Sequence, residues 1–187
     1  MTSERVRTRL RVALLVGGLA GLLATAGCSS GSGSSQPSWA AGLGSGVTVT
    51  GPASVSPGNG SPGAAVQGLI TALNAKKYSD ECGYLQPSSQ DNCKAESGQL
   101  STSNAPYATN TGIGYVAVHG SQALVGTTGT YCSPGSSPEC YTNSDPAAVF
   151  SSGKSFSTLW TEANQNSNTN SYTLAPCVEV NGKWYIG

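Results

Sequence analysis

The sequence contains six cysteines, and their spacing favours covalent crosslinks over catalysis. Five of the six lie between residues 82 and 177, and four of these form two pairs that are close in sequence, Cys82 with Cys93 and Cys132 with Cys140. We expect both pairs to form disulfides. Each would close a loop of about ten residues and contribute roughly 2–3 kcal/mol to stability.

The odd number of downstream cysteines leaves Cys177 as a thiol. We interpret Cys177 as a small buried apolar residue, with a reactive thiol or an intermolecular disulfide as the alternatives. The sequence contains no Cys-x-x-Cys, and its one histidine is isolated, so we expect no metal site. It also contains no phosphate-binding loop, and we expect no cofactor.

His119 is the one imidazole that could act as a general base. Such a base needs a carboxylate that orients it, but Asp80, Asp91 and Asp145 lie in segments expected to be helix or loop. We therefore interpret His119 as a residue at the mouth of a hairpin. A catalytic His119 remains the alternative.

Two short motifs match known catalytic or binding patterns without their context. Residues 151–154 read Ser-Ser-Gly-Lys, the Ser-x-x-Lys pattern of penicillin-recognising enzymes, but the accompanying Ser-Asp-Asn and Lys-Thr-Gly elements are absent. Residues 112–117 fit Gly-x-Gly-x-x-Ala, but they lead into an expected strand instead of a helix. Neither motif indicates a site, so the sequence predicts no catalytic residue.

The first 28 residues have the organisation of an export signal. Four arginines before Val12 precede an uncharged run over residues 12–27, which closes with Ala26-Gly27 and is followed by Cys28. The run is shorter than the ~20 apolar residues that a membrane-spanning helix needs. A cleaved signal that leaves Cys28 at the new N-terminus is therefore expected.

Residues 22–29 resemble the signals of bacterial lipoproteins of actinobacterial type. The resemblance implies that residues 1–27 are a signal peptide and that Cys28 receives lipid, including palmitate. The mature protein would then be lipid-anchored on the extracytoplasmic face of the cell membrane, where disulfides form readily. A secretory peptide with a coincidental cysteine and a retained, uncleaved anchor remain the alternatives.

Removal of the signal changes the charge of the chain. The full sequence has nine basic and nine acidic residues, and four arginines and Glu4 precede Cys28. The mature chain therefore has five basic (9 − 4) and eight acidic (9 − 1) residues, a net charge of −3. Nucleic acids and anionic surfaces attract clustered basic residues, so we expect neither as a partner.

Composition divides the mature chain into two parts. Residues 28–61 are rich in glycine, serine and proline and carry no charge. Such a segment buries too little apolar surface to offset its ordering entropy, so we expect a flexible tether. The alternatives are a short edge strand over residues 47–50 and a Trp39 side chain that lies in the membrane interface or against the domain. Residues 62–187 are long enough for one domain with its own core.

Hydrophobic spacing predicts alternating helices and hairpins in this domain. Gly120-Ser121 and Asn181-Gly182 are two-residue turn signals between strand-like runs, and Ser61-Pro62 suits the start of a helix. Expected helices cover residues 62–77, 79–85 and 155–163, and expected strands cover residues 114–119, 122–131, 172–180 and 183–186.

These elements resemble the NTF2-like, or cystatin-like, superfamily. The matching segments are AAVQGLITALNAKKYSDECGYL, GYVAVHGSQALVGTTGTYC and YTLAPCVEVNGKWYIG. The resemblance implies an α+β fold in which a curved antiparallel sheet forms a cone and the N-terminal helices pack on one face. We expect the two disulfides to staple it.

Four aromatic residues are candidates for lining a pocket in such a cone: Tyr115, Tyr131, Trp160 and Trp184. Ligand pockets are mostly apolar with a few polar groups, whereas burial in the core is the simpler explanation for the same residues. A sheet that encloses a cavity would favour the pocket.

Three functions fit these features. The first is a lipid-anchored, non-catalytic extracytoplasmic domain that binds a small apolar ligand or a cell-envelope partner. The second is a structural or accessory subunit of an envelope protein complex. The third is a small-molecule enzyme of the NTF2-like type that uses His119 as its base. We favour the first.

Overall fold

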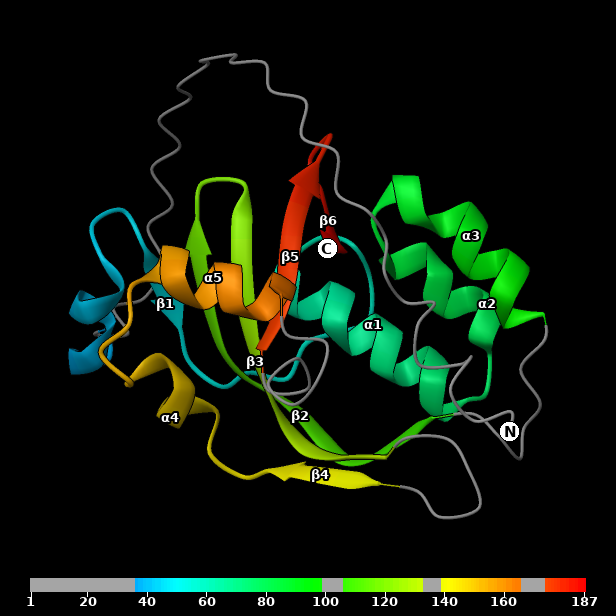
Figure 1. The fold of residues 1–187 in the computed structure, drawn as a ribbon, viewed down its shortest axis with the longest axis horizontal. Coiled ribbons are helices and arrows are strands. Elements are labelled where there is room, and N and C mark those ends of the chain that lie inside the picture. Colours follow the sequence, from blue (N-terminus) through cyan, green and yellow to red (C-terminus); the bar gives the residue numbers. More distant parts are fainter. Residues whose placement is uncertain (1–35, 99–105, 133–138, 166–173) are drawn as a thin grey trace. The chain divides into compact units, whose positions relative to one another are not determined.

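One open antiparallel sheet forms the centre of the fold (Figure 1). The structure, a computed structural model, describes residues 36–98, 106–132, 139–165 and 174–187. Within these residues the sheet order is β1-β2-β3-β5-β6, and β4 pairs with β3 alone. The bounds are β1 Thr48–Thr50, β2 Tyr107–His119, β3 Gln122–Cys132, β4 Cys140–Asn143, β5 Leu174–Val180 and β6 Lys183–Ile186.

Helices precede, interrupt and cover this sheet, so the α+β class expected from the sequence is confirmed. Two disulfides are present as well. The 3-10 helices are η1 Ser38–Leu43 and η2 Cys82–Tyr84, and the α-helices are α1 Pro62–Asn74, α2 Tyr78–Glu81, α3 Pro87–Ser97, α4 Pro146–Phe150 and α5 Phe156–Gln165.

Local hydrogen bonds at both ends define the bounds of helix α1. The Ser61 hydroxyl accepts a hydrogen bond from the Ala64 amide at 3.2 Å, and Pro62 occupies the first helical position. At the other end Lys76 adopts a left-handed conformation, with φ of 58°. Its amide and that of Lys77 donate to the carbonyls of Leu73 and Ala72, which satisfies two carbonyls that the helix would otherwise leave without partners.

Both expected hairpins are confirmed. His119 pairs with Gln122 across Gly120-Ser121, and Val180 pairs with Lys183 across Asn181-Gly182. Asn181 and Gly182 have φ of 53° and 73°, the two positive values that a type I′ turn requires. The right-handed twist of this turn matches that of the strands it joins, so the register of β5 and β6 is set locally.

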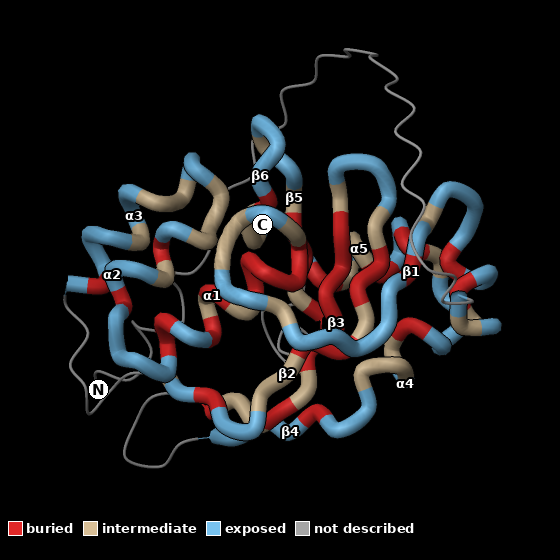
Figure 2. The backbone as a smooth tube through the Cα atoms, turned by 180° about the vertical axis from the view of Figure 1, so that it is seen from behind, coloured by how far each residue is buried: buried red, intermediate tan, exposed pale blue. Residues whose placement is uncertain are grey.

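Helices cover both faces of the sheet, whereas the sequence predicted helices on one face. One buried cluster joins α1 to residues such as Val125, Cys177 and Trp184, and the other joins α4, α5 and η1 to Ala117 and Leu124. Adjacent β3 residues, Leu124 and Val125, therefore lie in different clusters. Figure 2 shows the resulting buried stretches on the central strands, while α2 and α3 remain largely exposed.

Two glycines allow α4 to approach the sheet closely. A Cβ at Gly114 would lie 2.3 Å from Cγ of Pro146, and a Cβ at Gly126 would lie 2.8 Å from Cε2 of Phe150. Real Cβ atoms do not come this close to other heavy atoms, so larger residues here would displace α4. Phe150 itself is 1% exposed. The absence of side chains at Gly114 and Gly126 thus allows the Phe150 ring to pack in the core.

The folded part of the chain starts well before residue 62, which differs from the tether expected over residues 28–61. Ala40 and Leu43 of η1 are buried in the α4–α5 cluster, together with Val49 of β1. β1 pairs antiparallel with residues 116–118 of β2. The low-complexity composition favoured disorder over the alternative of a docked segment, but these few apolar residues pack against distant parts of the sheet.

We predict that Trp39→Ala destabilises the domain by about 2 kcal/mol, less than the 3–5 kcal/mol typical of a fully buried tryptophan. The reason is that the half-buried Trp39 ring stacks on Phe150 and contacts Tyr115. Urea unfolding monitored by circular dichroism measures the change. Ser38→Ala, at an exposed neighbouring position, is the control and should leave stability unchanged. Equal stability of both variants would show that this segment is not part of the folded domain.

Candidate functional site

The four aromatic residues proposed as pocket lining lie on opposite faces of the sheet. Tyr115 and Trp160 pack against the α4–α5 cluster, whereas Tyr131 and Trp184 belong to the α1 side. Trp184 is 9% exposed, and it packs among the core residues of its face. The four side chains therefore do not line one common cavity.

Aromatic rings fill the space between the sheet and η1, α4 and α5. The Trp39 ring stacks on Phe150 with centroids 5.6 Å apart and meets Tyr115 edge-on at 5.1 Å. Phe156 stacks on Trp160 at 6.1 Å. Such offset and edge-on pairs add to the stabilisation that burial provides. On this face the rings contribute packing instead of an open binding surface.

His119 lies at the exposed end of β2. Its ring is 5.5 Å from that of Phe156, and Gly46 approaches it closely. In the described part of the chain, no carboxylate comes within ion-pair distance of this imidazole. Asp80 and Asp91 lie in α2 and α3, and Asp145 caps α4 by accepting from the amides of Ala147 and Ala148. The structure does not bring these residues together.

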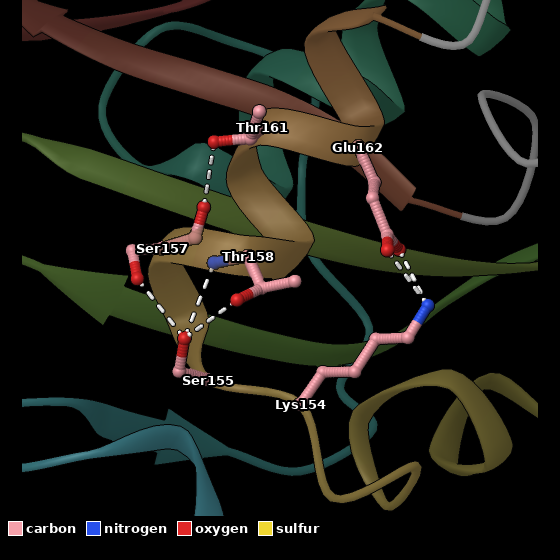
Figure 3. A network of polar contacts seen from close by, with 6 residues as sticks. All are labelled: Lys154, Ser155, Ser157, Thr158, Thr161 and Glu162. Carbon is pink, nitrogen blue, oxygen red and sulfur yellow. Dashed lines mark hydrogen bonds and ion pairs between the residues drawn. The ribbon is translucent and has the colours of Figure 1, made fainter.

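The Ser-x-x-Lys motif is divided between two separate polar contacts. The Ser151 hydroxyl donates to the carbonyl of Ala148 at 3.3 Å, whereas Lys154 Nζ lies 2.8 Å from both carboxylate oxygens of Glu162 (Figure 3). Ser155, not Ser151, caps the following helix and accepts from the Thr158 amide at 3.2 Å. Lys154 is therefore positioned as an ion-pair partner and not as a base for Ser151.

The cysteines adopt the pairing expected from their spacing. Cys82 bonds to Cys93 and Cys132 bonds to Cys140, while Cys177 is a free, fully buried thiol. Burial raises the pKa of Cys177 far above its usual range. Across the described residues no group of histidine, cysteine and acidic side chains could hold a metal ion.

Two hollows lie beside the first half of β2, at the surface. One, of about 420 Å³, lies between residues 52–55, Gln67 and residues 111–113. The other, of about 390 Å³, is lined by the end of α1, Tyr78 and residues 106–109. Neither lies where the four aromatic candidates are. Sequence reasoning did not indicate them, because they arise from the crossing of segments that are distant in sequence.

The borders of the sheet differ in how they are covered. The outer side of β6 is bonded to Asn59, whose backbone carbonyl accepts from the Trp184 amide at 2.8 Å and whose side chain donates to the Trp184 carbonyl at 2.8 Å. On β2 the Ala108 amide donates to Asn74 Oδ1 at 3.1 Å. β4, by contrast, pairs only with β3 among the strands that the structure describes.

Glu81 in α2 is the one described carboxylate with a strongly perturbed pKa. Burial raises the pKa of Glu81 from 4.5 to about 7, because a low-dielectric surrounding disfavours the charged form. It follows Asp80 and directly precedes Cys82 of the first disulfide. The half-buried carboxylate thus places a titratable group beside the crosslinked helices.

No helix in the described ranges is long and apolar enough to cross a bilayer. Comparisons with protein-family models, with curated proteins and with solved structures found no match for this chain.

We predict that Cys177 resists thiol reagents in the folded protein. Its sulfur is 0% exposed and lies 3.9 Å from the carbonyl oxygen of Pro62, and burial suppresses the reactive thiolate. Titration of residues 29–187, which lack Cys28, with a chromogenic disulfide should find about zero reactive thiols before denaturation and one afterwards. Rapid labelling of Cys177 in the native state, located by peptide mass spectrometry, would contradict its structural role.

We predict that the stability of the domain falls between pH 4.5 and 7 because of Glu81. The folded state binds this proton more tightly than the unfolded state, so the contribution is favourable below pH 4.5 and is lost as pH rises to about 7. Glu81→Gln should then raise stability at pH 8 by roughly 1–2 kcal/mol, allowing for screening of a half-buried group.

Urea unfolding at pH 4, 6 and 8 measures this dependence. Glu96→Gln, at an exposed position of α3, is the matched control and should follow the wild type at each pH. If Glu81→Gln and the wild type show the same pH profile, Glu81 is not the group responsible.

Proposed function

We propose that this chain is a lipid-anchored extracytoplasmic protein whose folded domain binds another protein of the cell envelope without catalysis of its own. Cys28, the residue after the signal, would carry the lipid, and residues 1–27 would be removed. The domain would belong to the NTF2-like superfamily. The order of N-terminal helices, a hairpin, further helices and a closing hairpin supports this assignment.

The packing of both faces of the sheet carries this proposal. Ala117, Leu124, Val125 and Cys177 are each fully buried between the strands and their covering helices. Side chains thus occupy the space in which a cone-shaped domain would hold a small ligand. What the domain offers to a partner is then its surface, which is the property of a binding or accessory module.

A small ligand is the second candidate. The hollow of about 390 Å³ at the end of α1 favours it, since Leu73 and Tyr78 give it apolar walls and Lys76 lies at its border. Its volume is at the lower end of the range for ligand pockets. The enzymatic alternative depends on His119, whose ring lies on Phe156 at an exposed position.

Crosslinking in intact cells tests the proposed function. The full chain, expressed with a photoreactive residue at exposed positions around the domain, should form one major adduct with an envelope protein. Metabolic labelling with an alkyne-tagged palmitate should mark the wild type and leave Cys28→Ser unlabelled, because the lipid that carries the acyl chains would be bonded to the Cys28 thiol. Acyl chains in pairs hold a protein firmly to a bilayer, so the variant should also leave the membrane fraction.

Three outcomes would contradict this function. An unlabelled wild-type chain would show that the protein carries no palmitate anchor. Absence of any adduct, together with thermal stabilisation by a small apolar molecule, would support the pocket in place of a protein partner. A measurable turnover that His119→Ala abolishes, with stability unchanged, would support the enzyme.

A further inference from the structure

Strand edges expose backbone groups that can pair with another chain, and most proteins cover them. The outer edge of β6 is covered, since Trp184 bonds to Asn59 and the Ile186 carbonyl accepts from the Gln86 amide at 3.0 Å. The free side of β2 is covered in another way. Asn74 Oδ1 accepts a hydrogen bond from the Ala108 amide, and the register shifts near residues 110 and 114 distort the strand.

β1 is an edge strand that is too short to pair over many residues. It has three residues, and Gly51-Pro52 follows it. Proline lacks the amide that a continued ladder would need. Among the described edges, β4 therefore stands apart, because it has neither a bulge nor a proline within it. Figures 1 and 2 show it from opposite sides at the outer border of the sheet.

The pairing with β3 fixes which groups of β4 point outward. Cys140 lies opposite Cys132 with a Cα–Cα distance of 4.1 Å, the short spacing of a non-hydrogen-bonded antiparallel pair. Alternation then makes Thr142 a second such residue. The amides and carbonyls of Cys140 and Thr142 thus point away from β3, and in the described part of the chain nothing bonds to them.

This edge is held rigidly. The Cys132–Cys140 disulfide fixes one end, the hydroxyls of Thr130 and Thr142 lie 2.8 Å apart, and the Asn143 side chain donates to the Thr127 carbonyl. A strand already fixed in its bound conformation loses little entropy when another strand pairs with it. The Tyr141 ring, 37% exposed, offers apolar surface to alternate side chains of an added strand.

Acidic residues flank this edge at both ends. Glu139 directly precedes β4, and Asp145 follows Asn143 by two residues. A second copy paired antiparallel about Tyr141 would bring its Asp145 diagonal to Glu139 of the first, and like charges at that spacing repel. A strand with a basic residue at each end would instead be attracted at both ends.

We propose that the outer edge of β4 receives an extended segment of a partner protein that has a lysine or arginine at each end. The segment adds one strand beside β3 and β4 through the backbone groups of Cys140 and Thr142. This binding mode, in which a peptide extends a sheet, gains affinity from the main chain and specificity from the flanking side chains. The proposal rests on the proposed function and names the site and the partner's chemistry.

The test uses a heptapeptide, acetyl-Lys-Thr-Val-Thr-Val-Thr-Lys-amide, whose lysines are spaced like residues 139 and 145. Titration into the mature domain, followed by amide NMR, should shift the signals of Cys140 and Thr142. The same peptide with glutamate in place of both lysines should bind at least about tenfold more weakly, and added salt should reduce this difference.

Two variants of Thr142 distinguish a loss of peptide binding at this edge from a loss of folding. Thr142→Pro removes an amide that points away from β3, so the fold should persist while peptide affinity falls at least about tenfold. Thr142→Val keeps the amide and the β preference, so it should bind like the wild type. Thermal unfolding of both confirms that they are folded, and Thr142→Arg serves as a second binding variant if the proline variant is unstable.

Several results would overturn this site. Equal affinity of the proline and valine variants would do so, as would equal binding of the lysine and glutamate peptides or no binding of the lysine peptide at millimolar concentration. Slow hydrogen exchange of the Thr142 amide in the free protein would show that the chain itself covers the edge. If the cellular adduct forms equally with Thr142→Pro, the domain still binds a protein partner, as the proposed function requires, but not through the edge of β4.

Discussion

Burial of both faces of β3 is the constraint on which the rest of the fold depends. Leu124 and Val125 are adjacent, point to opposite faces and are both 0% exposed. One helix layer cannot exclude water from both, so α1 covers one face while α4, α5 and η1 cover the other. A near-continuous apolar run in a central strand is the sign of a sheet covered on both sides. Residues 38–50 are needed because they complete the second layer.

Charge contributes little to this arrangement. The one ion pair between described side chains joins Lys154 to Glu162 at an exposed position, where such pairs are worth about 0–1 kcal/mol. Stability therefore depends on apolar burial and on the two disulfides, which reduce the entropy of the unfolded chain. Both disulfides lie away from the centre of the sheet, one in the α2–α3 region and the other between β3 and β4. They link η2, directly after α2, to α3 and β3 to β4, and α2, α3 and β4 have few buried residues.

Local patterns predicted the local elements of this fold well. The cap at Ser61, the turn at Asn181-Gly182 and the near-sequence cysteine pairs depend on residues a few positions apart, and the structure contains all of them. The face on which α5 packs could not be predicted, because Phe156, Leu159 and Ala163 define an apolar stripe but not the side of the sheet that receives it. For a related reason, the packing of Trp39 and Val49 against the domain was only the alternative to a flexible tether. Their order depends on Phe150 and Ala117, more than 60 residues away in sequence.

The candidate site was less predictable than the fold, since it is a property of edges. A sequence indicates which residues form strands, but an edge exists only once the strand order is known. Here β3 pairs with β2 along one side, while β5 and β4 share the other. β5 in turn pairs with β6, whose border is bonded to Asn59. Among the described strands none lies beyond β4, and the charges of Glu139 and Asp145 at its ends disfavour a second copy. With the interior filled by side chains, this border offers backbone groups to which nothing else in the described part of the chain bonds.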